Sequence, residues 1–324
     1  MTTVGVHRHL SLCSDPAGFF CILAIDHRDN LIAELQKHAA APVTFDDVVR
    51  FKQDVIGIAS GATAVLTDPD YGMPALTQDA ALQRLGRLAP LEVTDYKPHP
   101  SQRKPRLIPD WDAGKLQRAG FNGAKLLVFF HPDAADAAEK TTLVDRLAVA
   151  CAEAGVPLFL EPIAYSLDPA RALTNAERRQ VVVANARHFT GRGATILKME
   201  FPLDAATEPD ERVWDAALRE LDAACTVPWA LLSGGTAFNI FVRQVDAACR
   251  AGACGVIAGR AVWAEAIALA GDARRDFLAT TGRARVRQLD DICRASAASW
   301  RDRTPPPDVR QRWYATESAP IAAT

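Results

Sequence analysis

The residue in this sequence with the clearest chemical potential is a lysine inside an apolar run. The stretch ATILKMEFP (194–202) has Lys198 in its middle and Glu200 two positions later. Side chains alternate along a strand, so Lys198 and Glu200 share one face, and Leu197 and Met199 share the other. With the apolar pair packed under helices, we expect Lys198 to point into the interior, where burial disfavours the charged ammonium. A neutral lysine amine can form a Schiff base with a ketone or aldehyde.

Two more polar residues interrupt apolar runs of the same kind. Lys125 lies in GAKLLVFFHP, and Glu161 lies in VPLFLEPIAY. A second cation near Lys198 would favour its neutral form further. Glu161, in apolar surroundings, is expected to have a raised pKa suited to a proton shuttle for iminium chemistry. The competing interpretation is a structural network in which the lysines pair with Glu161 or Glu200.

Three other apolar runs end in polar or glycine-containing turns. Asp26 closes the first run, where it would orient a substrate hydroxyl, cap the next helix or pair with Arg28. Glycines in the other two turns let backbone N–H groups approach an anion, although glycine also ends strands for steric reasons. An arginine beside them can clamp the anion. These two turns contain Ser233, Gly234 and Gly235 in one, and Gly259 and Arg260 in the other.

The apolar runs recur with a regular spacing that indicates the fold. They are continuously apolar rather than alternating, and they start roughly 30 to 40 residues apart, the length of a βαβ unit. Eight such strands alternating with helices predict an α/β protein with a (β/α)8 or TIM barrel, whose active site lies at the carboxyl ends of the strands. An open doubly wound sheet is the alternative, but no GxGxxG follows the first run. The expected strands are 19–27, 62–70, 91–96, 123–132, 156–165, 194–202, 227–235 and 254–263.

Helical patterns fill the intervals between these strands. Thr44 to Asp47 and Thr174 to Glu177 have the spacing of capping boxes. Residues 1–303 are expected to form a single barrel domain, and 304–324 an irregular tail that is partly disordered. The expected helices include 134–154, 206–224, 237–251 and a long charged helix over 271–300.

The composition restricts the class of protein. About half of the residues are hydrophobic, 23% are charged, and the formal net charge is −2, which favours neither a nucleic-acid nor a membrane partner. The seven cysteines include no CxxC pair, which argues against a disulfide framework or a zinc ribbon. The N-terminus lacks the apolar core of a secretory signal. We expect a cytoplasmic protein, assembled as a homo-oligomer.

Longer stretches match one enzyme family in register from about residue 19 to 302. They are LAIDHRDNL, AVLTDPDYG, LIPDWDAGKLQRAGFNGAKLLVFF, FLEPIAY, LKMEFP, VPWALLSGGT, AGACGVIAGRAVWAEAI and ASAASWRD. On these residues the chain resembles the class I tagatose-1,6-bisphosphate aldolases and the related sulfofructose-phosphate aldolases.

The resemblance implies a TIM barrel and a role for each matching residue. Lys198 would be the Schiff-base lysine and Glu161 the proton shuttle. Lys125 and Asp26 would complete the catalytic group. Anion binding would fall on Ser233, Gly234, Gly259 and Arg260, and Arg28 would contact the substrate.

One position departs from the family pattern. The family commonly has glutamine after the aspartate that matches Asp26, whereas this chain has His27. His27 would then be a substrate contact of a different kind, or a group that titrates near neutrality.

The leading hypothesis is a class I aldolase that needs no metal or other cofactor. It would cleave a ketohexose 1,6-bisphosphate or a 6-sulfo-ketohexose 1-phosphate to dihydroxyacetone phosphate and a three-carbon aldehyde. A transaldolase using the same lysine is a close alternative. Two alternatives of other classes remain: a non-catalytic sugar-phosphate-binding barrel, and a metal-dependent aldolase with zinc held by His27, His131, Asp68 and Glu161.

Overall fold

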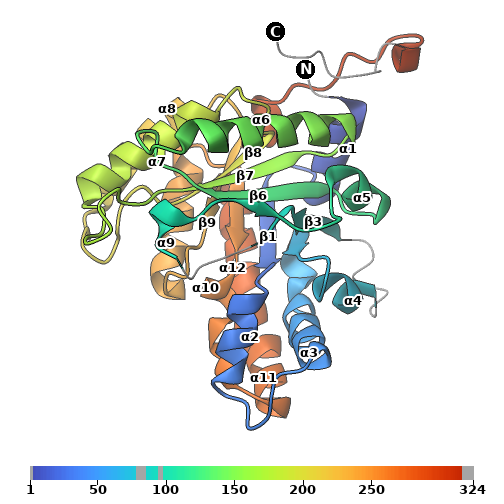
Figure 1. Cartoon of the computed structure of the whole chain (residues 1–324), viewed down its shortest axis with the longest axis vertical. Helices are drawn as coiled ribbons and strands as arrows, with labels where there is room; N and C mark the ends of the chain where they lie inside the picture. Colours follow the sequence, from blue (N-terminus) through green and yellow to red (C-terminus); the bar gives the residue numbers. More distant parts are fainter. Residues whose placement is uncertain (1–2, 78–84, 94–97, 316–324) are drawn as a thin grey trace.

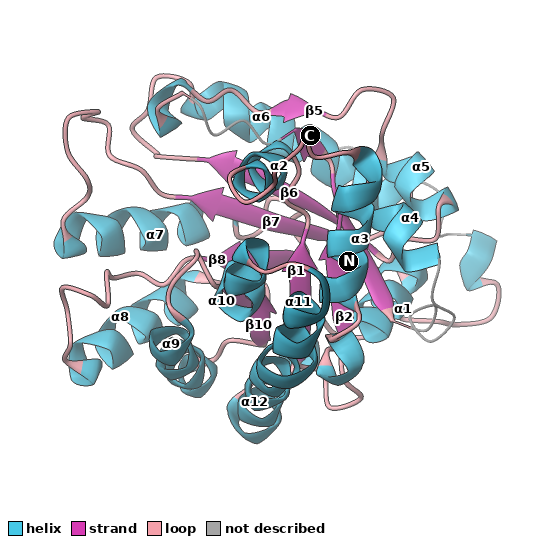
Figure 2. Ribbon diagram, turned by 90° about the horizontal axis from the view of Figure 1, so that it is seen from below, coloured by secondary structure: helices cyan, strands magenta, loops and turns pink. Residues whose placement is uncertain are grey.

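The computed structural model describes residues 3–77, 85–93 and 98–315, and it confirms the predicted TIM barrel. Eight parallel strands close on themselves in the order β1-β10-β9-β8-β7-β6-β3-β2. Helices surround the strands on the outside (Figures 1 and 2). The barrel strands are β1 Phe20–Ile25, β2 Ala64–Thr67, β3 Gly86–Pro90, β6 Gly123–Phe129, β7 Leu158–Ile163, β8 Ile196–Met199, β9 Trp229–Leu232 and β10 Gly255–Ala258.

The third barrel strand is not where the sequence pattern predicted it. The expected strand was 91–96, but the barrel uses β3, which pairs with β2 and β6. The segment after it contributes β4 Glu92–Val93, which pairs antiparallel with β5 Arg106–Leu107 in a separate two-stranded sheet. Residues 94–97 of the expected strand lie outside the described residues. A search for apolar runs passes over β3 because it contains Arg87 and ends in a proline, which strands tolerate at their margins.

The helices agree more closely with the pattern. Both predicted capping boxes are present, at Thr44–Asp47 and at Thr174–Glu177. The charged helix expected over 271–300 consists of α11 Gly271–Phe277, a π-helical turn over Leu278–Gly282, and α12 Arg283–Ser296. The other barrel helices are α2 Asp29–Gln36, α3 Phe45–Ile56, α4 Gly72–Thr77, α5 Ala113–Arg118, α6 Ala137–Glu153, α7 Asn175–Phe189, α8 Glu211–Ala224, α9 Phe238–Ala251 and α10 Arg260–Trp263.

The lower part of the barrel interior is a closed apolar layer. Phe20, Phe159, Ile196 and Ile257 point inward and belong to one buried cluster. The helix α1 Val4–Cys13, which the sequence pattern did not predict, adds Val6, Leu10 and Cys13 to this cluster, and Trp300 joins it. This packing closes the barrel at the amino ends of the strands. Polar side chains inside the barrel therefore lie nearer its other end.

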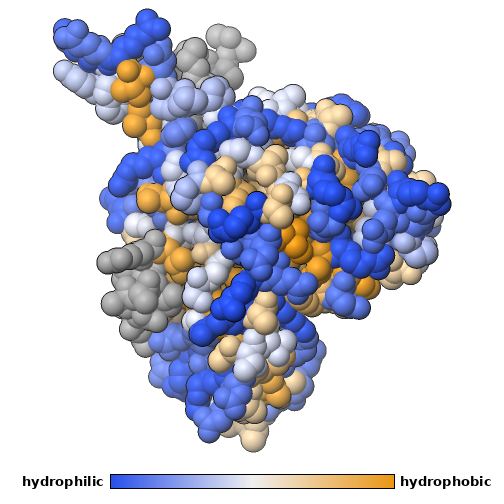
Figure 3. Space-filling model, turned by 180° about the vertical axis from the view of Figure 1, so that it is seen from behind, coloured by the Kyte–Doolittle hydropathy of each residue, from blue (hydrophilic) through white to orange (hydrophobic). Residues whose placement is uncertain are grey.

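The C-terminal segment leaves the barrel after Thr304, which is buried. Its described part, to residue 315, projects from the body of the molecule (Figures 1 and 3). Val309 and Tyr314 are exposed there. The remainder of the expected tail, 316–324, lies outside the described residues. Within the described ranges, no helix has both the length and the hydropathy of a membrane span.

Candidate active site

Three charged side chains point into the barrel directly above the apolar layer. In β7, Glu161 lies two positions after the inward-facing Phe159, and in β8, Lys198 lies two positions after the inward-facing Ile196. Because side chains alternate along a strand, Glu161 and Lys198 also face the barrel interior. Lys125 reaches the same level from β6. All three are buried, with 2 to 6% of each residue exposed. The prediction that Lys198 faces the interior is therefore correct.

Glu161 lies between the two lysines. Its Oε2 atom is 2.9 Å from Nζ of Lys198 and 3.2 Å from Nζ of Lys125. Lys125 also contacts two other carboxylates, with Nζ 3.1 Å from Oδ2 of Asp26 and 2.6 Å from Oε1 of Glu92. The result is a continuous buried cluster of two lysines and three carboxylates, drawn from strands β4, β6, β7 and β8 and from the residue directly after β1.

The two lysines differ in how many carboxylates stabilise their charged form. Lys125 contacts three carboxylates, whereas Lys198 contacts only Glu161 among the described residues. Loss of a proton from Lys125 would leave the buried charges of Asp26 and Glu92 without that partner, which is costly. Loss of a proton from Lys198 leaves Glu161 still paired with Lys125. Lys198 is therefore the amine better placed to become a neutral nucleophile.

The charges in the cluster set the ionisation of its carboxyl groups. Burial acts to raise the pKa of Glu161, but Lys198 and Lys125 outweigh it, and the pKa is lowered. The expectation of a raised pKa for Glu161 was therefore wrong, because two ammonium groups meet at one of its oxygens. The pKa of Asp26 is also lowered, since Lys125 and smaller contributions from His27 and Lys198 exceed the effect of burial. Ionised Glu161 can act as a base.

Glu200, the other predicted partner of Lys198, forms different contacts. Its Oε1 accepts a hydrogen bond from Arg178 Nη2 at 2.8 Å, and its Oε2 accepts one from the backbone N–H of Ala164 at 2.6 Å. Burial raises the pKa of Glu200, and Arg178 acts in the opposite direction. Glu200 thus connects β8 to α7 and to the end of β7.

The residues after β1 lie beside the cluster. Arg28 donates to the backbone carbonyl of Glu92 and makes no side-chain cap on α2. His27 packs edge-to-face against Trp263, with ring centroids 5.3 Å apart, and its Nδ1 is 3.9 Å from Oδ1 of Asp26. Burial lowers the pKa of His27 to about 4, although Asp26 opposes this. The expectation that His27 titrates near neutrality was therefore wrong, and its ring is neutral at pH 7.

The glycine-containing turns after β9 and β10 meet. The backbone N–H of Gly259 donates to Oγ of Ser233 at 3.1 Å. A serine hydroxyl that accepts this bond can still donate its own hydrogen to an anion. Gly234 and Gly235 have φ of 55° and 81°, which side-chain-bearing residues rarely adopt. A Cβ atom on Gly235 would lie 3.5 Å from Cζ of Arg260, so the exposed guanidinium lies beside this turn.

Two buried charged residues near the site were missed by the sequence analysis. Glu92 carries no local signal, because its partner Lys125 is 33 positions away along the chain. Lys52 is fully buried in α3, and its Nζ lies 2.5 Å from Oδ2 of Asp68 and donates to the carbonyls of Ile25 and His27. A lysine among Val48, Phe51 and Val55 on the apolar face of a predicted helix is the signal that could have found it.

The four residues considered as zinc ligands do not converge. Asp68 pairs with Lys52, and Glu161 pairs with the two cluster lysines. His131 lies 3.9 Å from Asp133 and packs its ring edge against Tyr165. The described part of the chain holds no group of three His, Cys, Asp or Glu side chains arranged to bind a metal ion.

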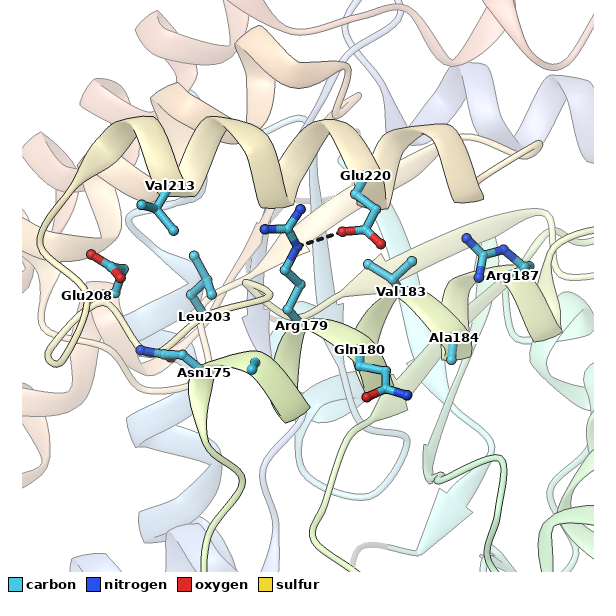
Figure 4. Close-up of a pocket in the computed structure, with 11 residues that line it drawn as sticks. Asn175, Arg179, Gln180, Val183, Ala184, Arg187, Leu203, Glu208, Val213 and Glu220 are labelled. Carbon is cyan, nitrogen blue, oxygen red and sulfur yellow. Dashed lines mark hydrogen bonds and ion pairs between the residues drawn. The ribbon is translucent and has the colours of Figure 1, made fainter.

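A surface groove of about 600 Å³ runs between α7 and α8 on the outer helical layer. In Figure 4, Arg179 reaches across it to Glu220, with Nε 2.6 Å from Oε2. Val183, Leu203 and Val213 contribute apolar surface. The residues that line it include no member of the lysine–carboxylate cluster, so this groove is distinct from the candidate active site.

Comparisons with known proteins agree with the fold. The family model described as "DeoC/LacD family aldolase" matches residues 20–265. A tagatose 1,6-diphosphate aldolase of Staphylococcus aureus is 28% identical over 316 residues, covering 90% of this chain and 95% of its own length.

Solved structures show the same architecture at lower sequence identity. A fructose-bisphosphate aldolase from Slackia heliotrinireducens superposes with a TM-score of 0.62 at 16% identity, covering 96% of each chain. A Schiff-base-forming fructose-1,6-bisphosphate aldolase, described from its reaction intermediates, superposes with a TM-score of 0.59 at 16% identity, covering 88% of this chain and 98% of its own. These likenesses concern the fold.

Proposed function

Because the chain belongs to the DeoC/LacD aldolase family, we propose that it is a class I aldolase in which Lys198 forms a Schiff base with a phosphorylated ketose. The observation that carries the proposal is the unequal pairing of the two buried lysines. Lys198 contacts one carboxylate among the described residues, and that carboxylate keeps a second cation, Lys125, at 3.2 Å. Lys198 can therefore lose its proton without leaving Glu161 unpaired.

The reaction follows from this arrangement. The neutral amine of Lys198 attacks the ketone carbon C2 to form a carbinolamine. The proton that Lys198 gave up returns through Glu161 to the carbinolamine hydroxyl, which leaves as water and gives an iminium ion. Glu161 takes the proton of the C4 hydroxyl, the C3–C4 bond breaks, and the three-carbon aldehyde leaves while the bonding electrons form an enamine. Glu161 returns the proton to C3, and water then releases dihydroxyacetone phosphate. Lys125 and Asp26 orient the reacting hydroxyl.

The substrate would carry an anionic group at each end. Ser233, Gly234, Gly259 and Arg260 adjoin one another after β9 and β10, where TIM barrels commonly bind phosphate, so we assign the C1 phosphate to them. We assign the C6 phosphate or sulfonate to the side of the barrel that carries Arg28 and neutral His27. The tagatose 1,6-diphosphate aldolase relative favours phosphate as the C6 group.

Reductive trapping tests the proposal directly. Borohydride added to the protein with dihydroxyacetone phosphate should attach the three-carbon unit to Lys198, as located by peptide mass spectrometry. Lys198→Met should abolish the adduct, whereas Lys104→Met should not, since Lys104 is an exposed residue whose only described ion pair is with Glu139 at 3.4 Å. Absence of an adduct on the wild-type protein would overturn the proposal.

A substrate panel then identifies the reaction. We would rank tagatose and fructose 1,6-bisphosphates and 6-sulfofructose 1-phosphate by kcat/KM. Adding an acceptor aldehyde separates aldolase from transaldolase. An aldolase releases free dihydroxyacetone phosphate without acceptor, and a transaldolase forms product only when the acceptor is present.

A further inference from the structure

The lysine–carboxylate cluster contains one acid that the proposed reaction does not use. Glu92 is 2% exposed, and its Oε1 lies 2.6 Å from Nζ of Lys125. Its other oxygen, Oε2, is buried and has no hydrogen-bond donor among the residues that the structure describes. An ionised carboxylate oxygen buried without a donor is unfavourable, whereas a protonated one is tolerated far better.

We propose that Glu92 is a positioning residue that receives, through Glu161 and Lys125, the proton that Lys198 loses when it becomes a nucleophile. The inference rests on the proposed Schiff-base function of Lys198. The contacts form an unbroken path, with 2.9 Å from Lys198 Nζ to Glu161 Oε2, 3.2 Å from that oxygen to Lys125 Nζ, and 2.6 Å from Lys125 Nζ to Glu92 Oε1.

The proton balance along this path is complete. Lys125 gives one proton to Glu92 and takes one from Glu161, which has taken it from Lys198. Before the transfer the cluster has two ammonium groups and three carboxylates, a net charge of −1; afterwards it has one ammonium group and two carboxylates, again −1. Release of the proton to solvent would instead increase the net negative charge of the buried cluster. Such a charge is energetically unfavourable because the protein interior solvates it poorly.

The surroundings of Glu92 fit the end of such a path. Burial raises its pKa and Asp26 adds to this, while Lys125 acts in the opposite direction. The other two carboxyl groups of the cluster have lowered pKa values, so Glu92 is the acid on which the proton settles. The charged groups around it are Lys125 from β6, Asp26 directly after β1, and Arg28 at its main-chain carbonyl; Lys125 in turn contacts Glu161 from β7.

The test is the pH dependence of adduct formation at Lys198. We would measure the initial rate of borohydride-trapped adduct with dihydroxyacetone phosphate from pH 6 to 10 in the wild type and in Glu92→Gln. In Glu92→Gln the carboxylate that accepts the proton is absent, so Lys198 must lose its proton to solvent. The rate of adduct formation in this variant should therefore fall about tenfold for each unit by which the pH is lowered on the acid side of the profile. We expect a loss of roughly 10- to 100-fold at pH 7 and recovery towards the wild-type rate near pH 10.

Two further variants separate this role from a structural one. Glu92→Asp keeps a carboxylate and should keep the wild-type pH profile at a lower amplitude. Glu200→Gln removes another buried carboxylate, which bonds to Arg178 and Ala164 instead of the lysines, and it should not shift the profile. An unshifted profile in Glu92→Gln, or an equal loss at every pH, would overturn the inference. A wild-type protein that forms no adduct would instead refute the proposed function itself.

Discussion

Lys52 and Asp68 form an ion pair in which neither side chain is exposed to solvent. Nζ of Lys52 lies 2.5 Å from Oδ2 of Asp68, and the same amine donates to the backbone carbonyls of Ile25 and His27 at the end of β1. Burial lowers the pKa of Lys52 while Asp68 opposes this. The pair attaches α3 to the strand end that carries Asp26, so it supports the active site without belonging to it.

Replacing Lys52 should therefore destabilise the protein strongly. Lys52→Met leaves the Asp68 carboxylate buried without its cation, and we expect a loss of about 3–5 kcal/mol in the free energy of unfolding measured with urea. Lys37→Met breaks an exposed pair with Glu34 and should have little effect. The double variant Lys52→Met/Asp68→Asn should regain part of the loss. Equal urea midpoints of unfolding for Lys52→Met and Lys37→Met would contradict this account.

The buried neutral ring of His27 should make stability depend on pH. Its pKa falls from 6.5 to about 4 on folding, so the unfolded chain binds a proton there at a pH at which the folded protein does not. The stability that this neutral ring contributes is present above pH 6.5 and is lost as the pH falls towards 4. His27→Gln should remove a decline of roughly 3 kcal/mol across that window.

Urea unfolding of the wild type and of His27→Gln at pH 7, 6 and 5 measures this difference. The difference between the two proteins in the free energy of unfolding should change most between pH 7 and pH 5. Parallel curves would show that His27 gains its proton in the folded state as readily as in the unfolded one. His38→Gln is the control, since His38 is exposed.

Much of the barrel could be predicted because parallel strands covered by helices are apolar on both faces. Seven of the eight expected runs contain a barrel strand, and alternation within ATILKMEFP placed Lys198 on the inner face. β3 was missed because Arg87 and a terminal proline interrupt its apolar pattern. The pairing of β3 with β2 and β6 defines it as a barrel strand, and this pairing is not visible in the sequence.

The ionisation of the site could not be predicted for a similar reason. The apolar neighbours of Glu161 along the chain suggested a raised pKa, but its pKa is lowered by Lys198 and Lys125, which approach it from β8 and β6. Glu92 was missed because only the fold brings it to Lys125. Local sequence thus indicated that Lys198 and Glu161 are buried, and the contacts across strands determine their charge.

Ser233 should contribute to binding of the phosphate end of the substrate. Ser233→Ala removes both the acceptor for the Gly259 N–H and a hydroxyl donor for the anion. We expect KM for the phosphorylated ketose to rise by roughly 10-fold or more, as the loss of a hydrogen bond to a charged group implies, with a smaller change in kcat. Steady-state kinetics would reveal this split, and a kcat loss with unchanged KM would place Ser233 elsewhere in the reaction. Ser101→Ala is the control, since Ser101 lies in the 3-10 helix Pro100–Gln102 and its hydroxyl contacts His99.

Gly235 allows a direct test of whether Arg260 and its turn bind an anion. A Cβ atom at Gly235 would lie 3.5 Å from Cζ of Arg260, whereas one at Gly191 would have no heavy atom within 4 Å; φ is 81° and 78° at these glycines. Ala at either position should therefore cost a similar amount of stability, about 1 kcal/mol, from backbone strain alone. Only Gly235→Ala would also place a methyl group in van der Waals contact with the guanidinium, where it would fill space beside Arg260 that an anion could occupy and so raise KM for the phosphorylated ketose. Melting temperatures and KM for both variants distinguish strain from anion binding, and an equal KM in the two would remove Arg260 from the proposed phosphate site.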